Sequence, residues 1–489
     1  MRIKNADTLT SHGNIKGRKD MVEILEAGLQ AGDPYVNLKK LIRIEGKTLY
    51  VGNPLFECNA DPRAGITEYN LDEIDRIYVV GAGKGIQRIA IAFEEVLGDY
   101  LTGGHVICKY GDDTDELKKI TYTHAAHPTP DENCIVGCKK ILEFTKDITE
   151  NDLVFTLAGN GVSALLTYPV DGISIQDVID LTYMMQIEKG VPTVQLNTIR
   201  NHIDVMKSGR ITKKFQPAKM VHIVAIDVNT DYNTPTPHTY DSFMSKNIWL
   251  HFLPDSSYFK DAVDILTHWD AWDKCPKSIK DYILLAPEDN ETVKFDEFKT
   301  FNDFRVFGIM PNKIGPVPMA MEKAKELGYN AVMLTDSHQC EASQQGLFVG
   351  TMALSSERHN TPFVPPVALF STGEMVVTVG EGKCVGGRTQ EYALASVFKI
   401  AGSEKIIMAA CDTDGTDGPG GFIADDAPKC LSGAIVDGYT VAEAKEQNVD
   451  IRAGLKSHNT SAVHWALKNG IYATQSISVL DLNVTLIMK

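Results

Sequence analysis

The sequence has no excess of positive charge. It contains 48 Lys and Arg against 64 Asp and Glu in 489 residues, which gives a formal net charge of −16. A chain with this balance has no general electrostatic attraction for nucleic acid or for an anionic lipid surface, so we expect neither as a partner. Any anionic ligand must bind in a local pocket whose charge opposes the net field of the protein.

Long apolar runs and paired cysteine motifs are also missing. No apolar run approaches the ~20 residues that a membrane-spanning helix needs, and residues 1–20 lack the apolar core of a signal peptide. The nine cysteines are an odd number and include no Cys-x-x-Cys pair. We therefore expect reduced thiols, a cytoplasmic protein and no metal site built on cysteine. The chain also has no Gly-x-Ser-x-Gly elbow, no His-Glu-x-x-His helix and no protein-kinase motif set.

Short apolar runs recur along the chain, and each is followed by a turn of small or polar residues. These runs occupy residues 76–80, 152–157, 220–226, 330–334, 367–370 and 405–410. Because they are apolar throughout rather than alternating, they predict strands covered on both faces, as in a parallel sheet flanked by helices. The fold class is therefore α/β.

One long segment interrupts this rhythm and suggests two domains. Residues 235–300 contain three of the four Trp residues and end in a polar stretch from 287 to 300. We interpret the segment as helical packing material that ends in a linker, with a second domain beginning near Phe301. The expected domains are residues 1–300 and 301–489.

A glycine-rich turn at residues 81–85 (GAGKG) follows the first of these short apolar runs, at residues 76–80. Gly81 and Gly83 would let backbone N–H groups approach an anion, and Lys84 would add a full positive charge. The turn is neither a Walker A loop nor a dinucleotide fingerprint, since Ile86 occupies the third glycine position of the latter. The alternative is a tight turn with a solvated lysine.

A second glycine turn follows the apolar run at 152–157. It contains Gly159, Asn160 and Gly161, and Ser163 provides an additional hydrogen-bond donor. A simple connecting turn is the alternative when this loop is taken alone. Two such loops in one chain indicate an anion-binding site more strongly than either loop alone.

An acidic loop at residues 411–421 (CDTDGTDGPGG) follows the apolar run at 405–410. The carboxyl end of a strand is where open α/β sheets bind ligands, and the oxygens of Asp414 and Asp417 suit Mg²⁺ bridged to phosphate. Gly415 would let a phosphate approach the backbone. An Asp-capped turn is the alternative.

Three further clusters carry polar side chains that could act on a ligand. In residues 386–391 (GGRTQE), Arg388 could bind a carboxylate or phosphate in a bidentate manner. Residues 127–131 and 197–202 hold two histidine-containing clusters, which rank lower because lone histidines are more often structural. Two anion loops, a basic pair (Lys84 and Arg388) and the acidic loop together suggest phosphoryl transfer to a small acid or alcohol.

The motifs as a set resemble the type II glycerate kinases, the glycerate 2-kinase family whose C-terminal half carries the MOFRL domain. The matching segments are GAGKG at 81–85, HPTPDENC at 127–134, LAGNGVSALL at 157–166, LNTIRNHID at 196–204, GGRTQEYALA at 386–395 and DTDGTDGPGG at 412–421. The resemblance implies an N-terminal Rossmann-like domain with a parallel sheet, a C-terminal α/β domain of the MOFRL type and an active site in the cleft between them. It implies phosphorylation of the 2-hydroxyl of glycerate, or of a related small 2-hydroxy acid, with ATP and Mg²⁺.

The resemblance also implies roles for individual residues. Lys84 would neutralise the transferring phosphate, Arg388 would hold a carboxylate or phosphate, and Asp227 would be the base or a metal partner. The nucleotide phosphates would contact Gly81, Gly83, Gly159, Asn160, Gly161, Ser163, Asp414 and Gly415, and the metal would contact Asp414 and Asp417. The substrate would contact His127, Asp131, Asn197 and Arg200.

Two alternatives stay open, because the chain departs from the family pattern after Asp227 and at residues 474–480. One is a hydroxypyruvate reductase, and the other is a non-catalytic protein that binds an acid or a nucleotide. A homo-oligomer is compatible with the sequence. In every case, we expect replacement of Lys84 or Arg388 by Ala to cost far more activity than stability.

Overall fold

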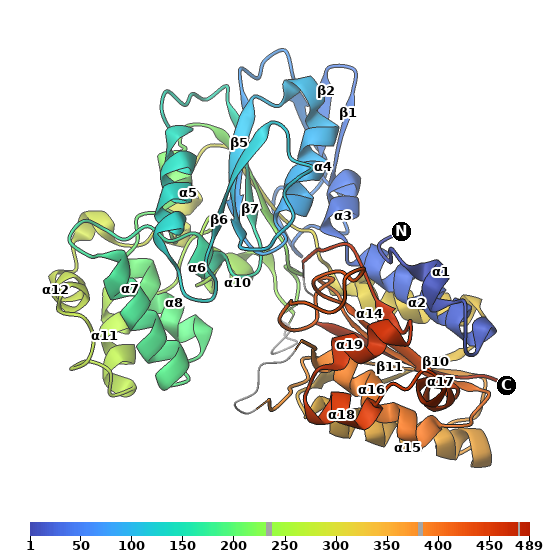
Figure 1. Ribbon diagram of the computed structural model, residues 1–489. Coiled ribbons are helices and arrows are strands. Elements are labelled where there is room, and N and C mark those ends of the chain that lie inside the picture. Colours follow the sequence, from blue (N-terminus) through green and yellow to red (C-terminus); the bar gives the residue numbers. More distant parts are fainter. Residues whose placement is uncertain (231–236, 380–384, 478–479) are drawn as a thin grey trace. The chain divides into compact units, whose positions relative to one another are not determined.

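The computed structural model of the chain describes residues 1–489 apart from 231–236, 380–384 and 478–479 (Figure 1). It contains two compact units, which we describe separately. Unit 1 consists of Met1–Asp33 and Asn312–Lys489, and unit 2 of Pro34–Pro311.

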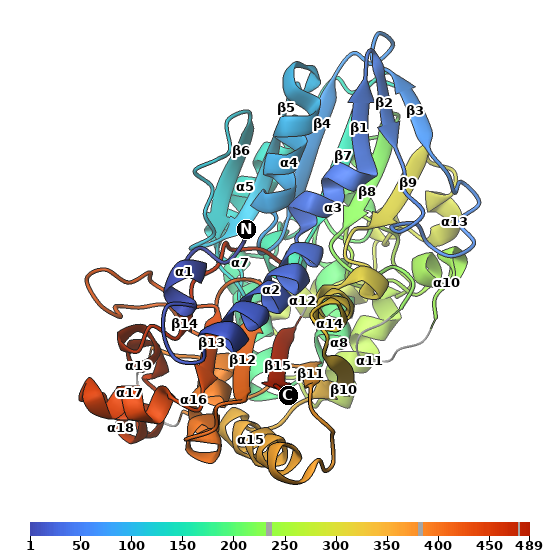
Figure 2. The same cartoon turned by 90° about the vertical axis from the view of Figure 1, so that its right-hand side faces the viewer.

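Unit 2 is built on a parallel sheet of six strands in the order β6-β5-β4-β7-β8-β9. Figure 2 shows the strands in this order. Their bounds are β4 Ile77–Ala82, β5 Gly103–Lys109, β6 Ile120–Ala125, β7 Leu153–Ala158, β8 Lys219–Val224 and β9 Phe304–Gly308. Every residue of β7 is buried, as its apolar sequence predicts. A small antiparallel sheet, β1 Ile42–Glu45, β2 Thr48–Val51 and β3 Thr67–Asn70, completes the strands described in this unit.

The helices of unit 2 connect these strands and form a helical cluster of their own. They are α3 Pro34–Leu41, α4 Gln87–Leu97, α5 Glu132–Glu143, α6 Val162–Leu165, α7 Ile175–Thr182, α8 Thr193–His202, α9 Arg210–Lys214, α10 Tyr240–Ser245, α11 Phe259–His268, α12 Lys277–Leu285 and α13 Phe295–Phe298. Apolar side chains of α7, α8, α11 and α12 pack together in a separate core. The expectation of helical packing material after residue 235 is therefore confirmed. The end of that segment is not a linker, since Phe298 of α13 is buried in the core beneath the sheet.

Unit 1 contains a mixed sheet of six strands in the order β10-β11-β15-β12-β13-β14. The bounds are β10 Asn330–His338, β11 Val367–Gly373, β12 Ile406–Asp412, β13 Gly433–Asp437, β14 Gly470–Ile471 and β15 Asp481–Ile487. Among the described strands of this unit, only β10 and β11 pair in parallel, since β15 is antiparallel to β11 and β12 and β13 is antiparallel to β12 and β14. The apolar runs predicted β10, β11 and β12 but not β13, β14 and β15. They did not predict strand direction, because burial on both faces gives the same apolar pattern for either direction.

The helices of unit 1 come from both ends of the chain. They are α1 Ala6–Leu9, α2 Ile15–Ala31, α14 Pro316–Glu326, α15 Ala342–His359, α16 Arg388–Ile400, α17 Thr440–Glu446, α18 Ile451–Lys456 and α19 Thr460–Ala466. The N-terminal α2, blue in Figure 1, packs beside α14. The α/β fold class with a parallel sheet and a second α/β unit is thus confirmed.

The units differ from the expected domain ranges 1–300 and 301–489 at both ends of unit 2. Residues 1–33 belong to unit 1 because α2 is held there by a buried ion pair between Arg18 and Asp437, with Nε and Oδ2 2.6 Å apart. At the other end, β9 pairs with β8 and so extends unit 2 beyond Phe301. Neither tertiary contact leaves a local signal in the sequence.

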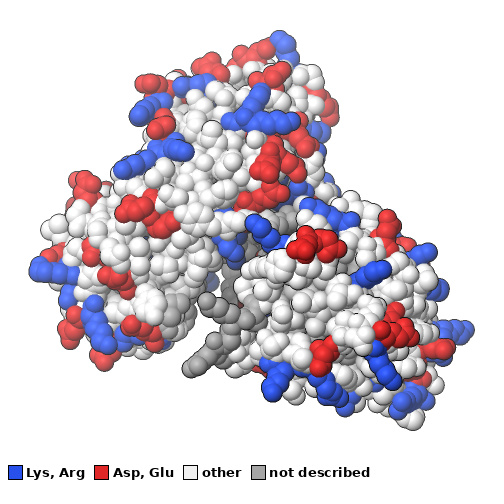
Figure 3. Space-filling view, viewed as in Figure 1, with Lys and Arg blue, Asp and Glu red and all other residues white. Residues whose placement is uncertain are grey.

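The surface carries charged side chains of both signs, as the composition predicts. On the face shown in Figure 3, basic and acidic side chains are interspersed. In the described part of the chain, no helix is both long enough and apolar enough to cross a membrane.

A buried histidine in β5 makes unit 2 sensitive to acid. The ring of His105 is bonded to Thr121 Oγ1 at 2.8 Å and Thr123 Oγ1 at 3.0 Å. Burial, with a smaller contribution from Lys140, lowers the pKa of His105 from 6.5 to about 4. Between pH 6.5 and 4 the unfolded chain therefore binds a proton that the folded chain does not, and stability is lost as the pH falls through this window.

We predict that His105→Gln flattens the pH dependence of the unfolding free energy. The depressed pKa corresponds to roughly 3 kcal/mol lost between pH 6.5 and 4, and the variant should lose about that much less. Urea unfolding at a series of pH values measures the difference. His268→Gln, at an exposed position of α11, is the matched control and should keep the parent slope. Equal slopes for His105→Gln and the parent would show that His105 titrates normally in the folded protein.

Candidate active-site residues

The two glycine turns lie side by side at one edge of the unit 2 sheet. Their strands β4 and β7 are parallel neighbours, and Ala82 is paired with Ala158 at the strand ends. The N–H group of Lys84 donates to the carbonyl oxygen of Asn160 at 2.7 Å, and the N–H group of Gly159 donates to that of Ala82 at 3.0 Å. The turns therefore form one continuous feature, which the sequence alone could not establish.

Glycine is required where the turns approach one another. Gly83 has φ +155°, and a Cβ atom there would lie 2.5 Å from the Cα atom of Gly159. Gly161 has φ +78°, and a Cβ atom there would lie 2.6 Å from Cδ2 of His127 and 3.4 Å from Cγ of Lys84. The side chains of His127 and Lys84 thus flank the second turn, and glycine leaves them room.

The hydrogen-bond donors that face a ligand come from the second turn rather than the first. The N–H group of Gly83 donates to Ile107 at 3.1 Å, and Gly81 is paired within the sheet. This corrects the expectation that Gly81 and Gly83 donate to phosphate, since their N–H groups serve the packing of the strands. The N–H groups of Gly161 and Ser163, by contrast, have no hydrogen-bond partner among the residues that the structure describes.

Lys84 is a positive charge beside the second turn, with its Cγ atom 3.4 Å from the position of a Cβ atom on Gly161. It is half-buried, and no carboxylate of the described residues lies within ion-pair distance of its ammonium group. Burial, followed by Lys84 itself, lowers the pKa of His127 to about 4, so the imidazole is neutral at pH 7. The pair can therefore offer one cation and one neutral ring to an anionic ligand.

The cluster at residues 197–202 stands directly behind the second turn. Ser163 Oγ is 3.0 Å from Asn197 Nδ2 and 2.9 Å from His251 Nε2. Arg200 is buried and donates to Asn197 Oδ1 at 3.4 Å and to Thr182 Oγ1 at 3.1 Å. Asn197 contacts Ser163 directly and Arg200 contacts Asn197, and the predicted contact of these two residues with the substrate stays a prediction. The position of His251 beside Ser163 could not be predicted from the sequence, because His251 lies in no recognisable motif.

The two remaining acidic candidates of unit 2 are engaged in local turns. Asp131 begins α5, where its carboxylate accepts from the N–H group of Cys134 at 3.3 Å and from the hydroxyl of Tyr110 at 2.8 Å. These bonds orient the carboxylate at the start of α5, and its contact with the substrate stays a prediction. Asp227 follows β8, and its two oxygens accept from Asn229 N–H and Thr230 O–H at 2.8 and 2.9 Å. It nevertheless lies at the same sheet edge as the glycine turns, since β8 adjoins β7.

In unit 1, Arg388 is the centre of a buried ion-pair network. Its Nη2 atom is 2.6 Å from Asp412 Oδ2, and its Nε atom is 2.9 Å from Asp481 Oδ1. Burial raises the pKa of Asp481 to about 7, and burial with neighbouring Asp414 raises that of Asp412. Nη1 lies 3.7 Å from Glu374, a longer separation than those of the other two nitrogens from Asp412 and Asp481. Asp481 was missed because it stands alone at the start of the C-terminal strand.

Two carboxylates of the acidic loop differ in their surroundings: that of Asp417 is held by the fold, and that of Asp414 is partly exposed. Asp417 is buried, and its oxygens accept from the N–H groups of Thr389 and Gln390 at 3.2 and 2.9 Å, which caps α16. This corrects its assignment as a metal ligand. Gly415 donates its N–H group to Asp412 at 3.2 Å, and it too serves the turn rather than a phosphate. Asp414 is partly exposed, with Oδ1 bonded to Thr416 and Oδ2 without a hydrogen-bond partner in the described residues.

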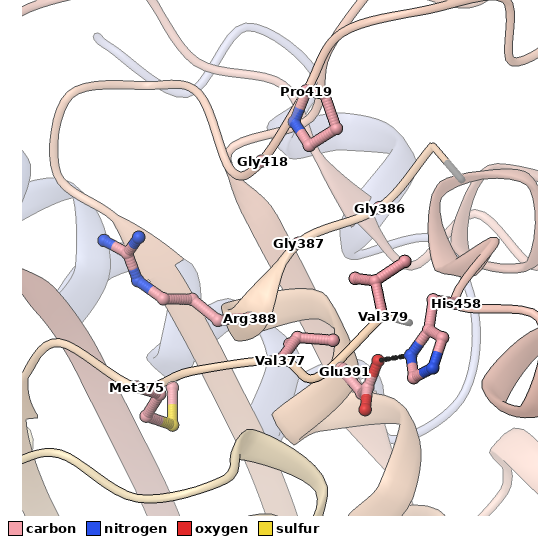
Figure 4. Close-up of a pocket in the computed structure, with 10 residues that line it drawn as sticks. All are labelled: Met375, Val377, Val379, Gly386, Gly387, Arg388, Glu391, Gly418, Pro419 and His458. Carbon is pink, nitrogen blue, oxygen red and sulfur yellow. Dashed lines mark hydrogen bonds and ion pairs between the residues drawn. The ribbon is translucent and has the colours of Figure 1, made fainter. Parts of the chain in front are cut away.

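Beside Arg388 lies a cavity of about 490 Å³, a size typical of small-molecule sites. Its walls are mostly apolar, and the ends are polar (Figure 4). Arg388 lies at one end and the Glu391–His458 pair, 2.8 Å apart, at the other. The lining consists of Met375, Val377, Val379, Gly386, Gly387, Arg388, Glu391, Gly418, Pro419 and His458.

No group of three His, Cys, Asp or Glu side chains in the described residues could hold a metal ion by itself. Mg²⁺ is nevertheless commonly bound by one or two carboxylates, with water and substrate phosphate completing the shell. Asp414 fits that role through its open Oδ2 atom, whereas Asp417 does not.

Two family models match the chain. One is a domain of unknown function, DUF4147, over residues 20–284, and the other is the MOFRL family, over residues 367–478. A glycerate 2-kinase of Pyrococcus horikoshii is 33% identical over 446 residues, which cover 90% of this chain and 90% of that protein. A D-glycerate 2-kinase of Thermotoga maritima is 33% identical over 391 residues, covering 79% of this chain and 84% of that protein.

A solved structure shares the fold. The crystal structure of glycerate kinase from Thermotoga maritima matches with a TM-score of 0.71 and 28% identity, over 96% of this chain and 99% of that chain. A putative hydroxypyruvate reductase of Agrobacterium vitis is more distant, at 28% identity over 411 residues, 82% of this chain and 85% of that protein.

The ion-pair network revises the expected effect of replacing Arg388. We predict that Arg388→Ala destabilises unit 1 by roughly 3–5 kcal/mol, because it leaves Asp412 and Asp481 buried without their cation. Adding Asp481→Asn should restore part of this loss without restoring function. Chemical denaturation of the single and double variants measures both effects. Arg358→Ala, at an exposed position of α15, is the control. If Arg388→Ala unfolds at the same denaturant concentration as the control, the network contributes nothing to stability.

Proposed function

We propose that this chain, which belongs to the glycerate 2-kinase family, transfers a phosphoryl group from ATP to the 2-hydroxyl of glycerate or of a related small 2-hydroxy acid. The family resemblance expected from the motifs is confirmed by the 33% identity over most of the chain. The observation that carries the proposal is the joined pair of glycine turns, where Lys84 adjoins two N–H groups and neither they nor its ammonium have a partner among the described residues.

The chemistry of phosphoryl transfer suits these residues. The reaction requires little covalent chemistry from a protein, so positioning and charge neutralisation supply most of the catalysis. We assign to Lys84 the neutralisation of charge on the transferring group. Gly161, Ser163 and Asn160 belong to the turn that contacts an oxyanion, and Gly159 provides the clearance.

Two further residues complete the proposed machinery of this sheet edge. Asp227 is the candidate base, since it ends β8 beside the second glycine turn. Its oxygens accept hydrogen bonds from Asn229 N–H and Thr230 O–H, which orient the carboxylate at this sheet edge. His127 is neutral and adjoins Lys84, which suits a contact with the substrate.

In unit 1, we assign a carboxylate or phosphate contact to Nη1 of Arg388, while Nε and Nη2 are held by Asp481 and Asp412. Asp414 is the proposed protein ligand of Mg²⁺, which when bound would neutralise charge on the nucleotide phosphates. The ligand partners are thus a small hydroxy acid and a nucleotide.

The cysteines support a cytoplasmic location as part of the proposal. The eight cysteines of the described residues are free thiols, and most are buried. That is the use of cysteine that a reducing compartment favours.

The hydroxypyruvate reductase alternative has no support from the geometry. A nicotinamide cofactor would need a glycine where Ile86 stands, and Ile86 is fully buried at the start of α4. The name occurs among the more distant relatives.

We predict that the protein forms ADP and a phosphorylated acid from ATP, Mg²⁺ and D-glycerate, and that Lys84→Ala lowers kcat/KM about 10²–10³-fold. The melting temperature of this variant should stay near that of the parent, since the ammonium pairs with no carboxylate of the described residues. A coupled assay for ADP, run beside thermal unfolding, measures both. Lys146→Ala, at an exposed position, is the control.

Three outcomes would contradict the proposal. If neither ADP nor a phosphorylated acid forms with any of a panel of 2-hydroxy acids, the chain is not such a kinase. NADH oxidation with hydroxypyruvate would instead support the reductase. Tight binding of the acid or nucleotide without turnover would support a non-catalytic binding protein.

A further inference from the structure

The hydroxyl of Ser163 is surrounded by donors. The residue is 8% exposed, and Oγ lies within hydrogen-bond distance of two side-chain nitrogens, Asn197 Nδ2 at 3.0 Å and His251 Nε2 at 2.9 Å. A serine oxygen has two lone pairs and one hydrogen. The direction of these two bonds therefore decides where the hydrogen points.

Arg200 fixes the direction of the Asn197 bond. Its Nη1 atom donates to Asn197 Oδ1, which leaves the amide nitrogen to donate to Ser163. Arg200 is buried, and no carboxylate of the described residues lies within ion-pair distance of its guanidinium. Its Nε atom is also without a partner. The buried Arg200 cation therefore donates to Asn197, and Asn197 in turn donates to Ser163.

The surroundings of His251 fix the direction of the second bond. The ring is completely buried, and Nδ1 has no hydrogen-bond partner in the described part of the chain. Burial, followed by Lys207 and Arg200, lowers the pKa of His251 well below its usual range, so the ring is neutral. We assign its single proton to Nε2, because an unpaired buried N–H group is rarer than an unpaired lone pair. His251 then donates to Ser163.

With both lone pairs of Ser163 occupied, its hydrogen has no acceptor among the described residues. It stands beside the open N–H groups of Ser163 and Gly161 and next to the turn that Lys84 flanks. The Ser163 hydroxyl and the two N–H groups are thus three donors beside the Lys84 cation, and none of the three has an acceptor among the described residues. A negatively charged oxygen of a ligand is the acceptor that suits such a set.

We propose that Ser163 is a fixed hydrogen-bond donor to an oxyanion of the ligand, and that Asn197, Arg200 and His251 are the positioning residues that orient its hydrogen. The proposal rests on the proposed function for the identity of the ligand, which is either the carboxylate of the hydroxy acid or a phosphate of ATP. Both present the same oxyanion chemistry, and the two arms of the test distinguish them.

The first experiment compares Ser163→Ala, His251→Leu and the conservative His251→Gln, whose amide can still donate. Loss of a hydrogen bond to a charged group should raise the KM for one substrate about 10–100-fold in Ser163→Ala and His251→Leu, with a much smaller change in kcat. His251→Gln should stay close to the parent. A rise for the acid identifies a carboxylate contact, and a rise for ATP identifies a phosphate contact.

The double variant tests whether His251 acts through Ser163. Ser163→Ala with His251→Leu should be no worse than Ser163→Ala alone, because the positioning residue then has nothing to orient. Additive losses would overturn the positioning role. Unchanged KM values for both substrates in Ser163→Ala would overturn the proposal as a whole.

Asn197→Asp covers the case in which His251→Leu fails to fold. The new carboxylate would pair with Arg200, which should preserve the melting temperature, and would accept the hydrogen of Ser163, which should weaken ligand binding at least 10-fold. Unchanged binding would contradict the proposal.

Direct binding separates this inference from the proposed function. Calorimetric titration of the parent and the variants with D-glycerate and with ATP reports affinity without turnover. If the parent binds but never phosphorylates, the kinase function is wrong, and the inference is decided by whether Ser163→Ala weakens binding. Equal affinities of the parent and Ser163→Ala for both ligands would overturn it.

Discussion

The close approach of two glycine turns is the constraint on which the rest of unit 2 depends. Gly83 and Gly159 touch at a distance that no Cβ atom would permit, and Lys84 and Asn160 are bonded through their backbones. Parallel pairing of β4 and β7 forces this meeting, since the carboxyl ends of neighbouring parallel strands share one sheet edge. The N–H groups of Gly83 and Lys84 in the first turn are bonded to β5 and to Asn160, whereas those of Gly161 and Ser163 have no partner among the described residues.

In unit 1, the main electrostatic constraint is the burial of carboxylates around one arginine. The carboxylates of Asp412 and Asp481 are buried, and a single guanidinium lies between them. Asp417 adds a third buried carboxylate, which accepts hydrogen bonds from the N–H groups of Thr389 and Gln390 at the start of α16. Two nitrogens of Arg388, Nε and Nη2, are therefore held in short ion pairs that support the fold. The third nitrogen, Nη1, is the one to which we assign the ligand contact.

The sequence predicted the strands β4, β7, β8, β10, β11 and β12 and the position of the glycine turns, because buried apolar strands and tight turns leave local patterns. It did not predict the other strands. It did not predict which residues satisfy which donors. Gly81 and Gly83 seemed to be phosphate donors, yet their N–H groups are used in packing, and Asp131 and Asp417 proved to be helix caps. His251 and Asp481 lie in segments without any motif and reach their partners only through tertiary contacts. The joining of residues 1–33 to unit 1 is equally non-local.

The most direct test of the central claim follows the phosphorus atom itself. ³¹P NMR of the complete protein with ATP, Mg²⁺ and D-glycerate should show the γ-phosphate signal of ATP decline while a phosphate ester coupled to the C2 proton of glycerate appears. ATP signals that persist while glycerate stays unphosphorylated would contradict the account, and an ester at C3 would contradict the assignment of the reacting hydroxyl.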